Sequence, residues 1–317
     1  MTTSSASDTR TWGHRWLWWL LGILIALVLI AYFAIGAVAA NLLTMPQRDF
    51  DPDQTPALLG LEYRDVSFPA RGEHMAIAGW YIPEPESTTG DPRAVIMVHG
   101  RDASRTAAVT GNFTKLAKAL HDAGLAVLMI DLRGHGQSAN ARFSFGLRER
   151  NDVLGAVDYL RQEGFQPGQI GVLGLSLGAA AGIGAAAEDP AIGALVTDSA
   201  FADINTLIAE QWDNASGLPR PFLYAALSMA HLLVGEDLTQ ARPVEEIGRI
   251  APRPLLMIHC QADDYIPVEN LTALAAAAPG AETWVITSPD CHHSEGFNVD
   301  PAAYAARVTT FFEQGLP

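Results

Sequence analysis

Short, almost continuous apolar runs alternate with longer segments of helical character over most of the chain beyond residue 93. Continuous apolar runs are typical of parallel strands that are covered by helices on both faces. Such runs occur at residues 94–98, 126–130, 170–173, 194–197, 255–259 and 283–287. Helices are expected between them, at residues 113–123, 148–163, 177–187, 268–278 and 301–314. The alternation predicts an α/β fold with an open, mostly parallel sheet that has helices on both faces.

Two segments fall outside this alternation. Residues 61–69 and 75–83 predict a pair of strands ahead of the sheet, joined by a turn at Arg71-Gly72.

Between residues 201 and 252 the alternation gives way to a long stretch of helical character. An insertion after a strand of such a sheet lies over the carboxyl ends of the strands, where ligands bind. We therefore expect a small helical lid over about 202–251, with a purely structural excursion as the alternative.

The N-terminal segment is the most hydrophobic part of the chain. No charged residue occurs between Trp16 and Thr44, and about 20 apolar residues are enough to cross a membrane as a helix. Tryptophans crowd one end of the run, and Arg10 and Arg15 lie close to them. Aromatic and basic residues favour that position at a membrane boundary. The pattern predicts a cytoplasmic tail over 1–15 and a single transmembrane helix over 16–43.

A linker is expected at residues 44–60, followed by an extracytoplasmic domain over 61–317. A cleaved signal peptide is the alternative, because Ala37-Val38-Ala39 has the small-x-small form of a cleavage site. The apolar run is much longer than the roughly 7–15 residues of a signal peptide's apolar region, which favours an uncleaved anchor. Both interpretations place the folded domain outside the cytoplasm.

Composition and charge narrow the range of partners. The 317 residues are 49% hydrophobic, which is enough for a large α/β core. The formal net charge of −15 argues against a nucleic-acid partner, because such a partner requires clustered Lys and Arg. The acidity does not identify a substrate.

The strand expected at 170–173 runs into Gly174-Leu175-Ser176-Leu177-Gly178, and a helix rich in small residues follows. A G-x-S-x-G sequence between a strand and a helix holds a nucleophilic serine on a tight turn. The two glycines are needed because a Cβ at either position would crowd that turn. We predict Ser176 as the nucleophile and the backbone N–H of Leu177 as one donor to the oxyanion.

A serine nucleophile needs a base, and the base needs an acid that orients it. The loop after the fifth strand contains Asp263 and Asp264, and the loop after the sixth contains His292 and His293. Carboxylate and imidazole thus follow the serine in the order Ser, Asp, His. A second oxyanion donor is expected in the loop after residues 94–98, and we assign it to the N–H of Arg101.

Together these motifs resemble the serine-nucleophile α/β hydrolase superfamily, in particular its branch of esterases, lipases and serine aminopeptidase-like proteins. The matching stretches are His99-Gly100, 131–138, 174–178 and 259–267. The last stretch is similar to the family's H-G-x-x-D-x-x-[VI]-P, which implies that Asp263 is the acid. His293 followed by Phe297 is similar to the family's final histidine with an aromatic residue four positions on, which implies His293 as the base. The resemblance covers about 60–315 and implies an α/β-hydrolase fold without a cofactor. We interpret residues 131–138 as a loop that supports the site.

Two positions depart from the family pattern. Cys260 stands where glycine is usual, and Cys291-His292-His293 replaces a single histidine. His292 therefore remains an alternative base, and Asp264 an alternative acid. Both cysteines lie on loops that this fold brings together, and an extracytoplasmic setting permits a disulfide. We predict a Cys260–Cys291 disulfide, with two unrelated buried thiols as the alternative.

A metal site is a competing interpretation of the same two loops. Nitrogen, sulfur and oxygen ligands that suit zinc would come from His259, Cys260, Asp263, Cys291, His292 and His293. Their spacing matches no compact ligand motif, and most of these positions already have a role in the triad or the disulfide. No metal is therefore predicted.

The sequence thus predicts a membrane-anchored serine hydrolase of the carboxylesterase or lipase kind. Its substrate would be a small-molecule or lipid ester or thioester, cleaved through an acyl-enzyme on Ser176. An aminopeptidase-like amidase or an acyltransferase would use the same three residues. A binding protein without catalytic activity is the remaining hypothesis, because a fold alone does not determine function.

Overall fold

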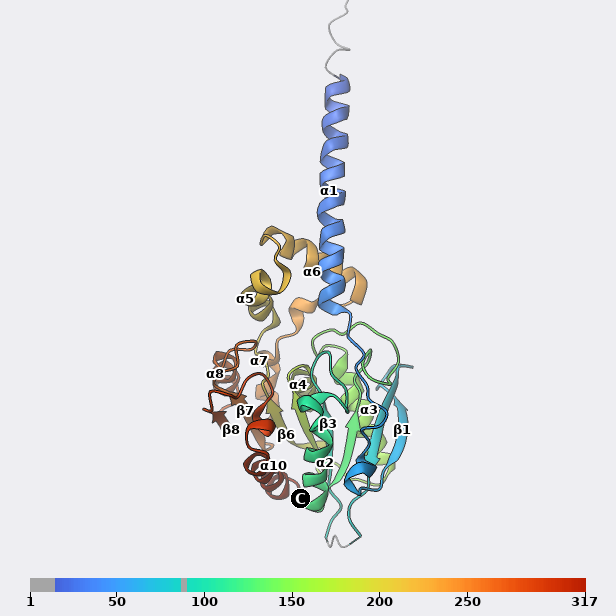
Figure 1. Ribbon diagram of the computed structural model, residues 1–317, viewed down its shortest axis with the longest axis vertical. Coiled ribbons are helices and arrows are strands. Elements are labelled where there is room, and N and C mark those ends of the chain that lie inside the picture. The colour runs from blue at the N-terminus through green and yellow to red at the C-terminus, as the bar shows by residue number, and fades with distance from the viewer. Residues whose placement is uncertain (1–14, 87–89) are drawn as a thin grey trace, which may run out of the picture.

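The expected strands form one eight-stranded sheet in a computed structural model that describes residues 15–86 and 90–317 (Figure 1). Its strand order is β1-β2-β4-β3-β5-β6-β7-β8. Strand β1 (Arg64–Pro69) pairs with β2 (Ala76–Ile82), and β2 pairs with β4; both pairings are antiparallel. The other pairings are parallel and join β3 (Ala94–Val98), β4 (Ala126–Ile130), β5 (Ile170–Leu175), β6 (Ile192–Asp198), β7 (Leu255–Cys260) and β8 (Glu282–Ile286). The tail predicted over 1–15 lies outside the described residues, apart from Arg15.

Helices cover both faces of this sheet, which explains why its central strands are continuously apolar. In β3, Ile96 and Val98 belong to one core cluster, and Val95 and Met97 belong to the other. The first cluster includes side chains from α3 (Glu149–Gln162), α4 (Leu177–Glu188) and α8 (Glu269–Ala277). The second includes side chains from α2 (Phe113–Asp122) and α10 (Pro301–Gly315). Both faces of a strand are thus removed from water.

The insertion after β6 forms helices on the side of the domain from which α1 emerges (Figure 1). It consists of α5 (Ile204–Ser216), α6 (Pro221–Val234), α7 (Pro243–Glu246) and the single turns Leu238–Gln240 and Ile247–Ile250. Helix α5 begins at an N-cap: the Asp203 side chain accepts a hydrogen bond from the Asn205 N–H. We call the pair α5 and α6 the lid.

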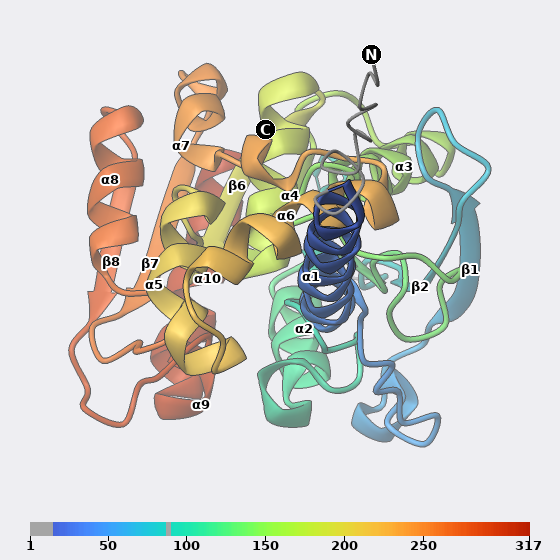
Figure 2. The same cartoon turned by 90° about the horizontal axis from the view of Figure 1, so that it is seen from above.

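The N-terminal helix α1 (Arg15–Thr44) packs its last third against the lid and stands away from the domain over the rest of its length (Figures 1 and 2). Its side chains are exposed from Arg15 to Ala31. Gly36 is buried, and a Cβ placed on it would lie 2.6 Å from the Cβ of Ala225 in α6. The absence of a side chain at Gly36 therefore lets the two helices approach closely.

Residues 45–60, which the sequence predicts as part of a linker, run along the surface of the domain. The Gln47 N–H donates to Asp102 Oδ1 at 2.8 Å, and the Asp51 N–H donates to Thr106 Oγ1 at 3.0 Å. The guanidinium of Arg48 donates to the carbonyl of Gly136 at 2.8 Å. These bonds hold the segment in place. The Thr44 carbonyl accepts a hydrogen bond from the Phe143 N–H at 3.1 Å, so α1 contacts the domain at its C-terminal end as well as at the lid.

Candidate active site

Ser176 occupies the turn between β5 and α4. Its backbone has φ 51° and ψ −113°, a conformation that a residue with a side chain adopts at an energetic cost. A Cβ on Gly178 would lie 2.5 Å from the carbonyl oxygens of Val98 and His99, and a Cβ on Gly174 would overlap the carbonyl of Gly178. Both glycines are therefore required by close backbone contacts, and the turn holds the Ser176 hydroxyl at the carboxyl end of β5.

Three loops bring Ser176, His293 and Asp263 into one chain of hydrogen bonds. His293 Nε2 lies 2.9 Å from Ser176 Oγ, and His293 Nδ1 lies 2.8 Å from Asp263 Oδ2. A neutral imidazole with its proton on Nδ1 satisfies both contacts, because it donates to the carboxylate and accepts from the hydroxyl. This is the geometry that activates a serine for nucleophilic attack.

Asp263 is buried, and its second oxygen is also occupied. Oδ1 accepts hydrogen bonds from the backbone N–H groups of Tyr265 at 3.0 Å and Ile266 at 2.8 Å. Burial by itself raises the pKa of a carboxyl, but the hydrogen bonds from His293 and Ile266 outweigh it and lower the pKa of Asp263 below its usual value. The group is therefore ionised near neutral pH. The alternatives Asp264 and His292 are exposed and lie outside this chain of hydrogen bonds.

The two cysteines form a disulfide beside these residues. Cys260 ends β7 just ahead of Asp263, and Cys291 precedes His293 by two positions in the loop after β8. Their Cα atoms lie 5.3 Å apart, and both residues are buried. The bond joins the loop that carries Asp263 to the loop that carries His293. In the part of the chain that the structure describes, no cluster of three His, Cys, Asp or Glu residues is arranged to hold a metal ion.

The backbone of residues 100–101 lies next to the nucleophile. A Cβ on Gly100 would approach Ser176 Cβ to 3.2 Å, and Arg101 lines a cavity of about 230 Å³ with Ser176 and His293. Leu177 is the first residue of α4, where backbone N–H groups have no acceptor within the helix. These are the two segments expected to supply oxyanion donors. The Arg101 side chain pairs with Asp102 at 3.0 Å.

The end of β6 supports the histidine loop, a contact that the sequence did not reveal. Ser199 Oγ accepts a hydrogen bond from the Ser294 N–H at 3.0 Å and donates to Asp198 Oδ1 at 3.0 Å. The Tyr304 hydroxyl donates to Asp198 Oδ2 at 2.8 Å. Burial raises the pKa values of Asp198 and Tyr304. The only signal for this group was an Asp-Ser pair after a buried strand, which is too common to single out.

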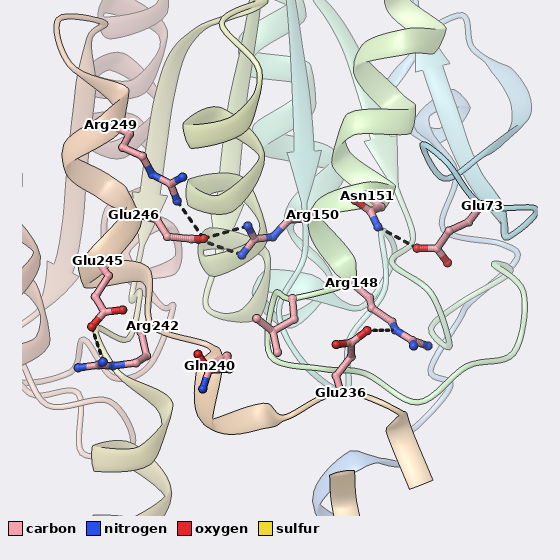
Figure 3. A pocket seen from close by; sticks show the side chains of 11 residues that line it. Glu73, Arg148, Arg150, Asn151, Glu236, Gln240, Arg242, Glu245, Glu246 and Arg249 are labelled. Atoms are coloured by element: carbon pink, nitrogen blue, oxygen red, sulfur yellow. Dashed lines mark hydrogen bonds and ion pairs between the residues drawn. The ribbon is translucent and has the colours of Figure 1, made fainter. Parts of the chain in front are cut away.

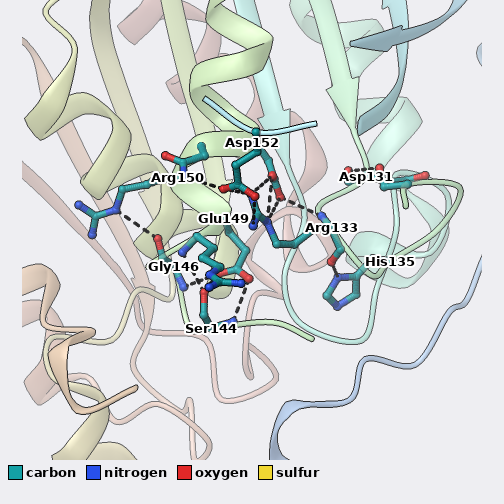
Figure 4. A network of polar contacts seen from close by, with 12 residues as sticks. Asp131, Arg133, His135, Ser144, Gly146, Glu149, Arg150 and Asp152 are labelled. Carbon is teal, nitrogen blue, oxygen red and sulfur yellow. Dashed lines mark hydrogen bonds and ion pairs between the residues drawn. The ribbon is translucent and has the colours of Figure 1, made fainter. Parts of the chain in front are cut away.

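Asp131, Arg133 and His135, from the run 131–138, are buried and belong to a network of polar contacts (Figure 4). Arg133 donates to Asp152 at 2.7 Å and to Glu73 at 3.0 Å, so its charge is matched. His135 Nε2 accepts a hydrogen bond from the Asp102 N–H at 3.2 Å, next to Arg101. His135 is thus buried and holds the loop of Arg101 from behind, in agreement with the supporting role interpreted for this run.

A larger cavity, of about 820 Å³, lies between α3 and the segment that links the lid to α7 (Figure 3). Its charged side chains pair with each other: Arg150 with Glu246 at 2.9 Å, and Arg148 with Glu236 at 2.9 Å. Among the described residues that line it there is no serine, cysteine or histidine. We therefore place the candidate active site at Ser176 and not in the larger cavity.

Comparisons with known proteins identify the family of this chain. A family model described as serine aminopeptidase, S33, matches residues 90–236. The uncharacterized protein Rv2307c of Mycobacterium tuberculosis is 30% identical over 222 residues, which cover 70% of this chain and 69% of the relative. The uncharacterized protein YqkD of Bacillus subtilis is 29% identical over 243 residues, 75% of each chain. The chain belongs to the α/β hydrolase superfamily, as the motifs implied.

Solved structures extend the likeness to the whole domain. The Pyrococcus furiosus esterase Pf2001 superposes with a TM-score of 0.66 at 25% sequence identity and covers 86% of this chain. The α/β hydrolase GrgF from a Penicillium species superposes with a TM-score of 0.63 at 18% identity over 81% of this chain, which supports the fold alone. The α/β-hydrolase fold that the sequence predicted is confirmed.

Proposed function

We propose that the protein is a serine hydrolase that cleaves a carboxylic ester or thioester through an acyl-enzyme on Ser176. The observation that carries the proposal is the chain of hydrogen bonds from Ser176 through His293 to Asp263. The strained turn at Ser176 and the structural likeness to an esterase support it further.

The mechanism follows from the contacts of each residue. Ser176 Oγ attacks the carbonyl carbon while its proton passes to His293 Nε2, and the ionised Asp263 stabilises the imidazolium. The N–H groups of Leu177 and Arg101 donate hydrogen bonds to the oxyanion of the tetrahedral intermediate. The alcohol or thiol then leaves with the proton from His293. A water molecule attacks the acyl-enzyme with His293 as base, which releases the carboxylic acid and restores Ser176.

We further propose that α1 anchors the enzyme in a membrane, with its N-terminus in the cytoplasm and its catalytic domain outside. The helix has 30 residues and a mean hydropathy of 2.8 over its most apolar window, so its length and composition suffice to cross a bilayer. Cleavage after Ala39 would remove Gly36 from its contact with Ala225 and Tyr32 from its hydrogen bond to the Pro221 carbonyl. These contacts favour the uncleaved anchor over a signal peptide.

The description of the matching family as serine aminopeptidases makes an amidase the second candidate. The two activities are separated by p-nitrophenyl butyrate and butyryl p-nitroanilide, which carry the same acyl group. We expect turnover of the ester at a rate well above that of the anilide, and loss of both in Ser176→Ala. An anilide rate equal to or above the ester rate would favour the amidase. Ester turnover that persists in Ser176→Ala would contradict the serine mechanism.

A further inference from the structure

A third cavity, of about 450 Å³, lies between the last third of α1 and the lid helix α5. Its volume falls in the range of small-molecule sites, about 300–1,000 Å³. Its walls are mostly apolar: α1 contributes Ile35, Val38 and Leu42, and α5 contributes Ile204, Leu207 and Ile208. The helix that we propose as an anchor thus forms one side of a binding-sized space.

This cavity adjoins the cavity at the nucleophile. Arg101 and Tyr265 line both of them. The Tyr265 ring packs edge-on against the His293 ring, with centroids 5.0 Å apart. A substrate chain that leads from Ser176 past Arg101 and Tyr265 would enter the space between α1 and α5.

The position of the lid on α1 places this cavity at a membrane surface. The exposed part of α1, from Arg15 to Ala31, is about 25 Å long at 1.5 Å per residue. The hydrocarbon core of a bilayer is about 30 Å thick. When α1 spans the bilayer, the lid therefore meets the membrane, and α6 there carries the exposed apolar side chains of Tyr224 and Leu232. Figures 1 and 2 show α6 against α1, with α5 on the same side of the domain.

We propose that the cavity between α1 and α5 binds the hydrocarbon chain of a lipid ester, and that α1 is a wall of the substrate site as well as an anchor. This rests on the proposed ester hydrolysis at Ser176. The cavity has an apolar wall on both sides, shares Arg101 and Tyr265 with the cavity at the nucleophile, and lies on the side of the domain from which α1 emerges. A long alkyl chain that leaves the bilayer would thus remain in apolar surroundings until its ester reached Ser176. The substrate class is accordingly a long-chain ester drawn from the membrane.

The test compares p-nitrophenyl palmitate with p-nitrophenyl butyrate on the full-length protein in the same detergent micelles. Leu42→Trp adds bulk to the cavity wall. Leu232→Trp is the matched control, because Leu42 and Leu232 are 74% and 73% exposed and only Leu42 lines the cavity. We expect kcat/KM for the palmitate to exceed that for the butyrate in the wild type. Leu42→Trp should lower kcat/KM for the palmitate at least about tenfold, which equals the loss of about two buried methylenes. It should leave kcat/KM for the butyrate within about twofold. Leu232→Trp should change neither value.

The outcomes separate this proposal from the proposed function. An unchanged palmitate-to-butyrate ratio in an active Leu42→Trp, together with unchanged hydrolysis of dodecyl acetate, would overturn the chain site and leave the hydrolase in place. Hydrolysis of neither ester by the folded wild type would overturn both. Dodecyl acetate, which carries the long chain on the alcohol, identifies which side of the ester enters the cavity. Sensitivity of either long-chain substrate to Leu42→Trp supports the proposal, and insensitivity of both contradicts it.

A second measurement needs no variant in α1. A palmitate that bears a diazirine near its methyl end is crosslinked to wild-type protein in micelles, and the adducts are mapped by mass spectrometry. We expect adducts on Ile204 and Leu207 of α5, which are buried and line the cavity. Adducts confined to the exposed stretch from Arg15 to Ala31 would contradict the proposal.

Discussion

Asp263 and Asp264 are neighbours in the sequence, but the fold gives their carboxylates different surroundings. Asp263 is buried and accepts hydrogen bonds from His293 and from the N–H groups of Tyr265 and Ile266, whereas Asp264 is exposed. The sequence placed two aspartates and two histidines on loops that the fold brings together. It could not choose within each pair from the residues alone, because a loop's backbone direction decides which side chain points inward.

Asp263→Asn tests the proposed role of the acid. The amide keeps the shape of the side chain but cannot stabilise an imidazolium by charge. In a well-known serine protease this change costs about 10⁴-fold in kcat, so we expect a loss of about 10³-fold or more in kcat for ester hydrolysis, with little change in the melting temperature. Asp264→Asn is the control and should stay within about twofold of wild type. Equal losses in the two variants would contradict the assignment.

Gly178, two positions after the nucleophile, gives a second test at the residue scale. Gly178→Ala places a Cβ at 2.5 Å from the carbonyl oxygens of Val98 and His99, so the helix must move away from the sheet. We expect a loss of about 2–3 kcal/mol or more in the free energy of unfolding, measured by denaturant titration in micelles. Gly22→Ala is the control, because a Cβ there meets nothing within 4 Å. Equal free energies of unfolding of the two variants would show that the turn has room for a Cβ at Gly178.

At the scale of elements, the disulfide between the loops after β7 and β8 holds the base and the acid together. It closes a loop with a sequence separation of 31 residues. Constraint of such a loop in the unfolded chain stabilises the fold by about 3–4 kcal/mol in a chain-entropy model. The Cys260→Ser, Cys291→Ser double variant should therefore unfold at lower denaturant concentration. We expect its kcat to fall as well, because the positions of Asp263 and His293 are less restricted. Unchanged stability and activity would show that the bond is dispensable.

Elements with local signals were predicted well, and contacts between distant elements were not. The β5–Ser176–α4 turn follows from an apolar run, two glycines and a small-residue helix, all within one short stretch. The support of Ser294 by Ser199 joins residues far apart in the chain, and no local pattern encodes it. The packing of α1 on the lid was also missed, because an apolar helix face has the same composition whether it contacts lipid or protein.

The pH dependence of stability is a property of the whole molecule. Burial lowers the pKa of His99 to about 3, whereas an unfolded chain has a histidine pKa near 6.5. Between these values the unfolded state binds more protons, so this group's contribution to stability is lost as the pH falls. Burial raises the pKa of Asp152 to about 7. The contribution of Asp152 to stability therefore has the opposite pH dependence, because it is lost as the pH rises. Because the two contributions oppose each other, the contribution of His99 is measured as the difference in free energy of unfolding between the wild type and a variant that lacks this histidine.

His99→Gln removes the titrating group, and the side-chain amide still provides an acceptor for the Leu132 N–H. We expect the free energy of unfolding of the wild type to fall relative to this variant by up to about 3 kcal/mol between pH 7 and pH 4. Denaturant titrations of the two proteins across this range give the difference directly. Parallel curves for wild type and variant would show that His99 takes up a proton in the folded state.

The whole molecule combines a hydrolase domain with a helix that is long enough to span a membrane, and its central claim is that Ser176 is an activated nucleophile. The most direct measurement is labelling of the full-length protein in membranes with a fluorophosphonate, wild type beside Ser176→Ala. We predict that the wild type is labelled and that the variant, present at the same level, is not. A folded wild type that does not react, or a variant that is labelled equally, would contradict the account.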